Sequence, residues 1–221
     1  MKIISSPLFE MIAQGEHQQQ DFKYCINDSR KIARSLVAFA NTDGGRLLVG
    51  VKDNGKIAGV RSEEEYYMVE AAANIYSKPK IPFDVQQWDA EGKTVLEIII
   101  KPSSNKPHYA QNDEKKWLAY IRLNDENILA NKVILKSWEL SKNPKGILFA
   151  YDEPRKNLID YLNNNQSISL SKFSRIAKIE RFYAEQILAE MLSLKCIETD
   201  LNSNPIQYRL NENFNFEQFP I

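Results

Sequence analysis

Four basic residues recur at three-residue intervals in the last third of the sequence. They are Lys172, Arg175, Lys178 and Arg181. Lysine and arginine side chains neutralise phosphate groups, so such a run could contact the backbone of a nucleic acid. A solvated helix face has the same spacing, and the acids Glu180, Glu185 and Glu190 on the same stretch weaken the attraction for phosphate.

A second set of basic residues lies in the first part of the chain, where each could also meet a phosphate. The set is Lys23, Arg30, Lys31, Arg34 and Arg46. Arg30 and Arg34 are one helical turn apart and would share a helix face. The chain carries 29 Lys and Arg against 29 Asp and Glu, so its net charge is zero. This balance excludes a protein that binds nucleic acid by bulk positive charge and leaves local basic patches as the alternative.

Several other chemistries lack the residues that they need. The two histidines, His17 and His108, have no cysteine partner at the spacing of a zinc site. The segment 43–46, Asp-Gly-Gly-Arg, is not a phosphate-binding P-loop. We find no signal-peptide pattern and no apolar run of the roughly 18 residues that would span a membrane. The cysteines, Cys25 and Cys196, lie far apart, and we expect reduced thiols in a cytoplasmic protein.

The first part of the chain mixes helices and strands without strict alternation, which predicts an α+β fold. Asp28 or Ser29 can cap a helix, and Asn41 can cap its end before Gly44 and Gly45. The triplet 53–55, Asp-Asn-Gly, is typical of a hairpin turn. We expect helices over 29–40, 62–76 and 132–140, and strands over 46–51, 56–60, 83–88, 93–101 and 118–122.

A break at 141–146, which contains Asn-Pro and Gly, separates this part from a helical region. We therefore expect two domains, residues 1–140 and 146–221. Expected helices over 152–162, 169–177 and 180–194 precede two strands, over 197–201 and 206–210. This order predicts a winged helix-turn-helix, with a generic three-helix packing module as the alternative. In a winged helix, Arg181, Glu185 and Gln186 would face the base edges.

One long stretch, from Glu16 to about Ala130, resembles the Schlafen AlbA-2 family, also called the divergent AAA-4 group. The resemblance is carried by five segments: Glu16–Lys23, Ala38–Gly55, Ile57–Val60, Lys106–Tyr109 and Ala119–Arg122. The second of them, with its Ala-Phe-Ala-Asn, Gly-Gly and Gly-Val elements, is the most specific. A winged-helix-like region is a common C-terminal appendage in bacterial members.

The resemblance implies a site of three carboxylates, because Schlafen-type members that cut RNA use such a site. The matching positions here are Glu16, Asp21 and Asp53, which would be both catalytic residues and ligands of Mg²⁺ or Mn²⁺. Asp21 stands where the family pattern usually has glutamate and is one methylene shorter. Alternatively, Asp53 is an ordinary turn residue and Glu16 a solvated acid.

Three functions follow from these features. The first is a nucleic-acid-binding protein of the transcription-regulator type, which binds DNA or RNA and needs no cofactor. Its expected contact residues are Lys23, Arg30, Arg34 and Arg46, together with Lys172, Arg175, Lys178 and Arg181. The second is a metal-dependent endoribonuclease, and the third is a protein-docking or assembly module. A homodimer is expected because pairing two weak patches gains avidity.

Overall fold

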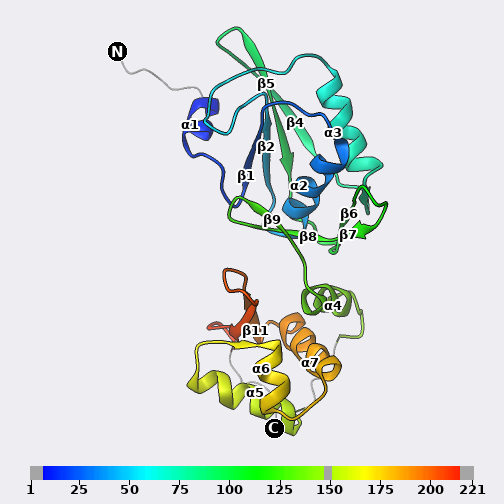
Figure 1. Cartoon of the computed structure of the whole chain (residues 1–221), viewed down its shortest axis with the longest axis vertical. Helices are drawn as coiled ribbons and strands as arrows, with labels where there is room; N and C mark the ends of the chain where they lie inside the picture. Colours follow the sequence, from blue (N-terminus) through cyan, green and yellow to red (C-terminus); the bar gives the residue numbers. More distant parts are fainter. Residues whose placement is uncertain (1–6, 147–150, 215–221) are drawn as a thin grey trace. The chain divides into compact units, whose positions relative to one another are not determined.

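The chain divides into two compact units, Met1–Ala130 and Asn131–Ile221, in a computed structural model that describes residues 7–146 and 151–214 (Figure 1). Both helices and strands occur in each unit, so the fold is of the mixed α+β class. None of the described helices combines the length and the hydropathy that crossing a bilayer requires.

A four-stranded sheet forms the centre of the first unit. The strands run in the order β1-β2-β5-β4, with β1 and β2 parallel and the other neighbours antiparallel. The elements of this unit are α1 (Pro7–Ala13), β1 (Gln20–Lys23), α2 (Ser29–Asn41), β2 (Gly45–Val49), α3 (Glu64–Asn74), β3 (Ser77–Lys78), β4 (Asp84–Ala90), β5 (Lys93–Ile100), β6 (Tyr109–Gln111), β7 (Trp117–Leu118), β8 (Tyr120–Leu123) and β9 (Glu126–Leu129).

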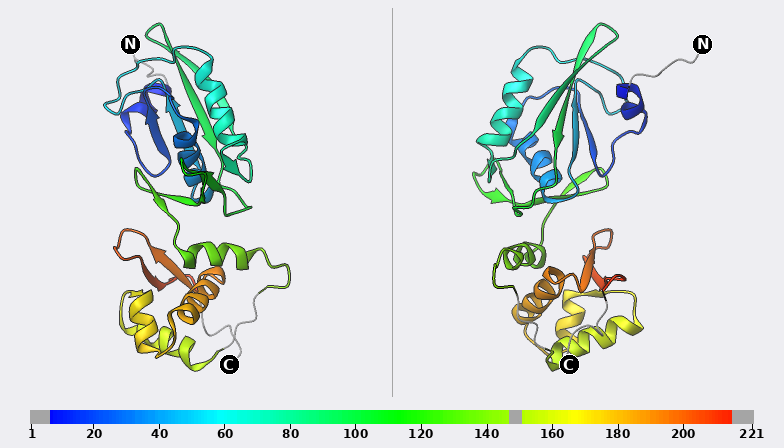
Figure 2. Two further views of the ribbon diagram at one scale, coloured as in Figure 1. Left: turned by 45° about the vertical axis from the view of Figure 1, so that its right-hand side comes forward. Right: turned by 180° about the vertical axis from the view of Figure 1, so that it is seen from behind.

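Strand β2 is buried on both faces of this sheet. Leu47, with Ile98 of β5, packs against α2 and α3, which cover the same face (Figure 2). The next residue, Leu48, packs with Phe22 of β1 and Leu8 of α1 in a second cluster. Successive side chains of a strand point to opposite faces, so two apolar layers form around one apolar strand. This explains the continuous apolar run that predicts a buried strand here.

The end of α2 is joined to two distant segments by one amide side chain. Asn41 Nδ2 donates to the carbonyl oxygens of His108 and Tyr120, both at 2.9 Å, and its Oδ1 accepts from the backbone nitrogen of His108 at 2.8 Å. Asn41 therefore does not cap α2 as expected; the cap is Thr42, whose backbone N–H donates to Phe39. The buried amide instead joins three of the segments that carry the family resemblance.

Most of the expected elements in this unit are confirmed, and one is wrong. Asp28 caps α2, its Oδ1 accepting from the backbone nitrogen of Arg30 at 2.8 Å. The strand expected over 56–60 is not formed. Only a single bridge joins Val51 to Ile57, because the chain then turns back and both following amides donate to the carbonyl of Gly50.

The second unit consists of helices and a three-stranded antiparallel sheet in the order β10-β12-β11. Its elements are α4 (Lys132–Ser141), α5 (Glu153–Asn164), β10 (Ile168–Ser169), α6 (Leu170–Ile176), α7 (Arg181–Ser193), β11 (Ile197–Asp200) and β12 (Gln207–Leu210). Helix α4 belongs to this unit, whereas the sequence suggested that it closes the first domain. Val133 of α4 is buried in the second core, with Phe173 and Leu188, and Asn131 donates to the hydroxyl of Tyr208 at 3.0 Å.

Gly44 is a position where the neighbouring backbone leaves no room for a side chain. Its φ is +71°, and an added Cβ would lie 2.7 Å from the carbonyl oxygen of Ile100. We expect Gly44→Ala to destabilise the first unit by about 3 kcal/mol or more, because left-handed strain and a backbone clash add. Urea unfolding measures the change.

The matched control is Gly15→Ala. Gly15 has nearly the same φ, +70°, but no atom lies within 4 Å of the added Cβ. This variant should lose only about 1 kcal/mol, from strain alone. Equal losses in the two variants would show that the close approach of Gly44 to Ile100 has no energetic weight.

Candidate functional site

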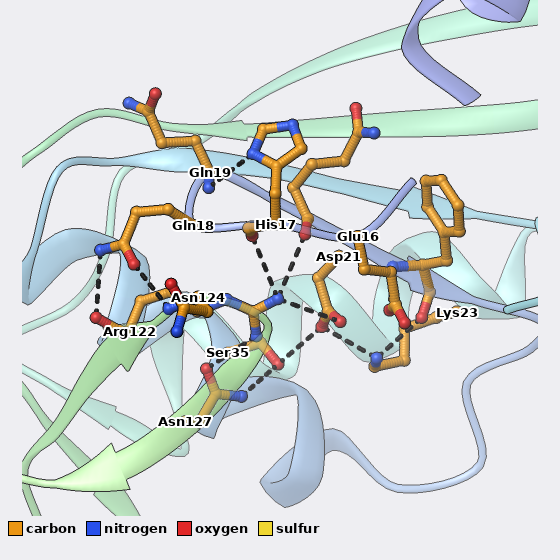
Figure 3. Close-up of polar contacts among 12 residues, drawn as sticks. Glu16, His17, Gln18, Gln19, Asp21, Lys23, Ser35, Arg122, Asn124 and Asn127 are labelled. Atoms are coloured by element: carbon orange, nitrogen blue, oxygen red, sulfur yellow. Dashed lines mark hydrogen bonds and ion pairs between the residues drawn. The ribbon is translucent and has the colours of Figure 1, made fainter. Parts of the chain in front are cut away.

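Two of the three acids implied by the family resemblance lie together at β1 (Figure 3). Glu16 precedes the strand, and its Oε1 accepts from the backbone nitrogen of Phe22 at 2.9 Å. Asp21 lies within the strand, is 4% exposed, and shares a hydrogen bond with the carboxyl group of Glu16. The local chain makes this pair, since it turns back on itself between His17 and Gln20 just before the strand.

The two carboxyl groups differ in their affinity for a proton. Burial raises the pKa of Glu16, and the hydrogen bond to Asp21 raises it further. Burial alone would also raise the pKa of Asp21. There, however, the charge of Lys23 and the hydrogen bonds from Glu16 and Lys23 outweigh burial and lower the pKa. The pair therefore holds its negative charge on Asp21 and its first proton on Glu16.

The charge of Asp21 is already met by groups of the protein. Lys23 Nζ lies 2.8 Å from Oδ2, and the hydroxyl of Ser35 donates to the same oxygen at 3.1 Å. Arg122 Nη2 lies 3.6 Å from the other oxygen, Oδ1. Both carboxylate oxygens of Asp21 thus face cations or donors.

Arg122 is the most deeply buried cation of this group, with 1% of its surface exposed. From β8 it donates to the carbonyl oxygen of Gln20 at 3.1 Å and to Asn127 Oδ1 at 3.1 Å. Its guanidinium group also lies over the ring of Phe39, 5.1 Å from the centroid. The β8–β9 hairpin is therefore anchored to β1 by one side chain.

Asp53, the third acid, lies elsewhere. It is exposed in the turn at 52–56, where the backbone nitrogen of Lys52 donates to the carbonyl of Lys56 at 3.0 Å. Over residues 7–146 and 151–214, no three His, Cys, Asp or Glu side chains form a group that could hold a metal ion. The residues around Asp21 therefore do not fit a divalent cation, because lysine, arginine and hydroxyl donors occupy the carboxylate.

Each of the four basic residues expected to contact phosphate in this unit makes a contact with another side chain of the same unit. Lys23 pairs with Asp21, as described above. Arg30 lies over the ring of Tyr76, 4.7 Å from its centroid. The other two are in ion pairs: Arg34 lies 3.7 Å from Asp113, and Arg46 lies 3.3 Å from Glu97.

A different cationic group lies beyond the end of β1, and we name it the Tyr24 cluster: Tyr24, Lys52 and Arg61. The ring of Tyr24 is 41% exposed. Lys52 Nζ lies 5.1 Å from its centroid and the guanidinium carbon of Arg61 lies 5.4 Å from it. Arg61 Nη2 also donates to the Tyr24 hydroxyl at 2.9 Å. Two cations thus flank one exposed aromatic ring.

Sequence reasoning missed this cluster, although a signal for it existed. Tyr24 directly follows β1, and Lys52 comes three residues after β2. The two strands are parallel neighbours, with Lys23 opposite Val49, so their ends lie at the same edge of the sheet. The parallel pairing could not be read from the sequence, since nothing local specifies it.

In the second unit, the basic run does not form one open cationic face. Lys172 lies over the ring of Tyr161 at 5.9 Å, and Arg181 lies 3.3 Å from Glu185. The other two residues of the run, Arg175 and Lys178, are exposed to solvent. The two remaining candidates for base contact are also engaged: Glu185 with Arg181, and Gln186 with Glu190.

Helix α7 is open to solvent only at its first turn. Arg181, Phe182 and Tyr183 are exposed, and every residue from Ala184 to Ser193 is buried or half-buried. Helix α4 packs along it: Lys136 lies over the ring of Phe182 at 4.6 Å, and the hydroxyls of Ser141 and Ser193 are 2.8 Å apart. Within this unit, the face of α7 that could enter a DNA groove is therefore narrow.

Comparison with known proteins places most of the first unit in a family. Residues 16–131 match the family described as Schlafen, AlbA_2. No curated protein matches the chain. Several solved structures are similar to part of it, including the following two. The DIP2311 protein from Corynebacterium diphtheriae is 19% identical with a TM-score of 0.43, and the match covers 59% of this chain but only 28% of that protein.

The second structure is the N-terminal domain of a protein from Nitrosomonas europaea that is related to the ATP-dependent DNA helicase RecG. It is 19% identical, with a TM-score of 0.40. The match covers 57% of this chain and 94% of that domain.

Because the pKa of Glu16 is raised and that of Asp21 is lowered, we expect opposite effects on stability when each acid is replaced by its uncharged amide. Asp21→Asn should destabilise the first unit by about 3–5 kcal/mol at neutral pH, because it leaves buried Arg122 without its counter-charge. Stability from the lowered pKa of Asp21 is present above the unfolded pKa and is lost as pH falls through the folded pKa. The difference between wild type and variant should therefore narrow in acid.

Glu16→Gln should be at least as stable as wild type at pH 7.5. The raised pKa of Glu16 means that its stabilising, protonated form is lost as pH rises through the folded pKa, and glutamine cannot ionise. Urea unfolding of both variants between pH 3 and pH 8 measures these trends. A loss of stability in Glu16→Gln as large as in Asp21→Asn would contradict the assignment of the charge to Asp21.

Proposed function

Because this chain belongs to the Schlafen, AlbA_2 family, we propose that it binds nucleic acid and does so through its first unit. The observation that carries the proposal is the Tyr24 cluster. Lys52 and Arg61 supply positive charge for phosphate, and the exposed ring between them supplies a surface on which a base can stack.

The cluster differs in its surroundings from three of the four basic residues of this unit that were expected to contact phosphate; the fourth, Arg30, also lies over a tyrosine ring. Lys23, Arg34 and Arg46 each face a carboxylate at 2.8 to 3.7 Å. Lys52 and Arg61 instead lie against the Tyr24 ring, and Arg61 also donates to its hydroxyl. In a chain of zero net charge, such a local patch gives weak, salt-sensitive binding.

Binding is supported better than metal-dependent cleavage of RNA. The nuclease proposal needs three carboxylates at one point, and the structure brings together only Glu16 and Asp21. The charge of Asp21 serves to hold Lys23 and Arg122. We therefore assign the carboxyl pair to the architecture of β1.

For the second unit, a specific observation favours protein docking over base recognition. The order α5-β10-α6-α7-β11-β12, with β12 central in the sheet, supports the winged-helix proposal. Helix α4 covers α7, however, and the exposed first turn presents Phe182, which is 72% exposed, beside Tyr183. Exposed aromatic rings are typical of protein interfaces. A regulator that holds nucleic acid with one unit and a partner, or a second copy, with the other is the simplest arrangement.

Removing the two cations of the cluster together tests the first proposal. Lys52→Ala with Arg61→Ala should weaken binding of labelled single-stranded oligonucleotides about 10-fold or more at 0.1 M salt. The slope of log affinity against log salt should fall by about 1.4, since two phosphate contacts are lost. Fluorescence anisotropy over a salt series measures both quantities.

The matched control removes two positive charges elsewhere on the same unit. Lys101→Ala with Lys116→Ala changes two exposed lysines that pair with Asp84 and Glu114. Its affinity should stay within about twofold of wild type. An equal loss in this control would mean that only total charge matters, and the Tyr24 cluster would have no special role.

A fourfold variant tests whether the basic run of the second unit holds DNA. Alanine at Lys172, Arg175, Lys178 and Arg181 should leave the affinity for duplex DNA within about threefold of wild type, because α4 and internal pairs occupy α7. If these residues made four phosphate contacts, the salt slope would instead fall by about 3.6. That larger change, measured by the same anisotropy assay, would restore the helix-turn-helix as the DNA-reading element.

A further inference from the structure

An open groove adjoins the Tyr24 cluster and is lined by residues at the start of α3 and on β4 and β5, with Arg61 common to both. Its volume is about 660 Å³, within the range of small-ligand sites in proteins. Arg61, Tyr66 and Tyr67 line it on the side of α3, and Val85, Gln87 and Leu96 line it on the sheet. None of these residues was singled out from the sequence.

Two of the walls are exposed aromatic rings at the beginning of α3. Tyr66 is 38% exposed and Tyr67 is 58% exposed. Their rings meet edge to face, with centroids 5.7 Å apart and planes at 73°, so they present differently oriented faces. The opposite wall adds Val85, a β4 residue that is 39% exposed. Exposing apolar surface of this kind to water is unfavourable, and covering it with a flat ring lowers the free energy.

The lining of the groove also includes polar and charged side chains. Gln87 and Thr94 supply amide and hydroxyl groups on its sheet side. Arg61 belongs both to the groove and to the Tyr24 cluster, and so joins the two. Glu63 lines the rim and would repel phosphate. A bound chain would therefore place its phosphates at Arg61 and Lys52 and its bases at the tyrosines.

We propose that this groove binds unpaired bases of a single-stranded nucleic acid, which stack on Tyr67 and Tyr66 while Arg61 and Lys52 hold the adjoining phosphates. The inference rests on the proposed function and narrows it to single strands. Bases of a duplex are stacked on each other and offer no free face, whereas those of a single strand do. Stacking accepts every base, so little sequence preference is expected.

Tyr67 is the residue to change, since its high exposure means that substitution leaves the core intact. Tyr67→Leu removes the aromatic face, and Tyr67→Trp keeps one. Trp117→Leu is the control, because Trp117 is another exposed aromatic residue, at 39%, but lies on β7 outside the groove. The probes are a labelled single-stranded oligonucleotide, the same strand with abasic sites, and its duplex, each as RNA and as DNA.

Wild type should bind the normal single strand about 10-fold more tightly than the abasic strand or the duplex. Tyr67→Leu should lose about 5- to 100-fold for the normal strand, the range for stacking on one aromatic ring, and little for the abasic strand. Tyr67→Trp should bind like wild type, and its tryptophan fluorescence should be quenched on binding. Trp117→Leu should be unchanged.

Two other results would overturn the inference and are distinguishable. If Tyr67→Leu binds all three probes like wild type while the Lys52 and Arg61 double variant loses them, the groove proposal is wrong and the proposed function stands. If wild type binds none of the probes at 50 mM salt, both proposals are wrong. In that case a protein partner would become the better candidate for the aromatic groove.

Discussion

The ion pair between Arg122 and Asp21 is the interaction on which the first unit depends. Both side chains are almost fully buried, and each charge would be costly without the other. Through Arg122 the β8–β9 hairpin holds the chain reversal before β1, and through Asp21 the strand holds Ser35 of α2. A single buried pair thus ties together segments about a hundred residues apart. A buried ion pair of this kind adds little net stability, but the cost of breaking it strongly disfavours other arrangements.

The pairing of Asp21 with cations of the protein also limits which ligands the first unit can bind. Since Asp21 is engaged with cations of the protein, it is not available as one of three metal ligands, and the raised pKa of Glu16 makes it the first of the pair to take up a proton. The basic residues near the sheet follow the same rule, because Arg46 is paired with buried Glu97. The buried acids Asp21 and Glu97 thus each pair with a basic residue of the same unit. The contacts that can be made with a ligand are then left to the few cations, such as Lys52, that have an aromatic neighbour instead.

In the second unit, too, charged groups that pair with each other are not available to a ligand. Arg155 is buried and bonds both Asp152 and Glu190, and Tyr183 donates to Asp152 at 3.0 Å. These contacts fasten the start of α5 to α7 and use Glu190, one of the acids that the sequence alone suggests would weaken DNA binding. With α4 packed along the helix, the exposed residues of α7 are Arg181, Phe182 and Tyr183 of its first turn. The part of α7 that is open to solvent is therefore limited to its first turn.

The sequence by itself determined the features that depend on near neighbours. Caps such as Asp28 and Asp152, the turn around Gly55 and the apolar run of β2 follow from contacts within a few residues, and the motif blocks were sufficient to indicate the family. Only the tertiary structure decided which charges meet. It joined Asp21 to Arg122 and placed Lys52 beside Tyr24, and it left Asp53 apart in its turn. The physical reason is that strand pairing and the competition among like cations for a buried acid are set by contacts between distant segments, which no local pattern encodes.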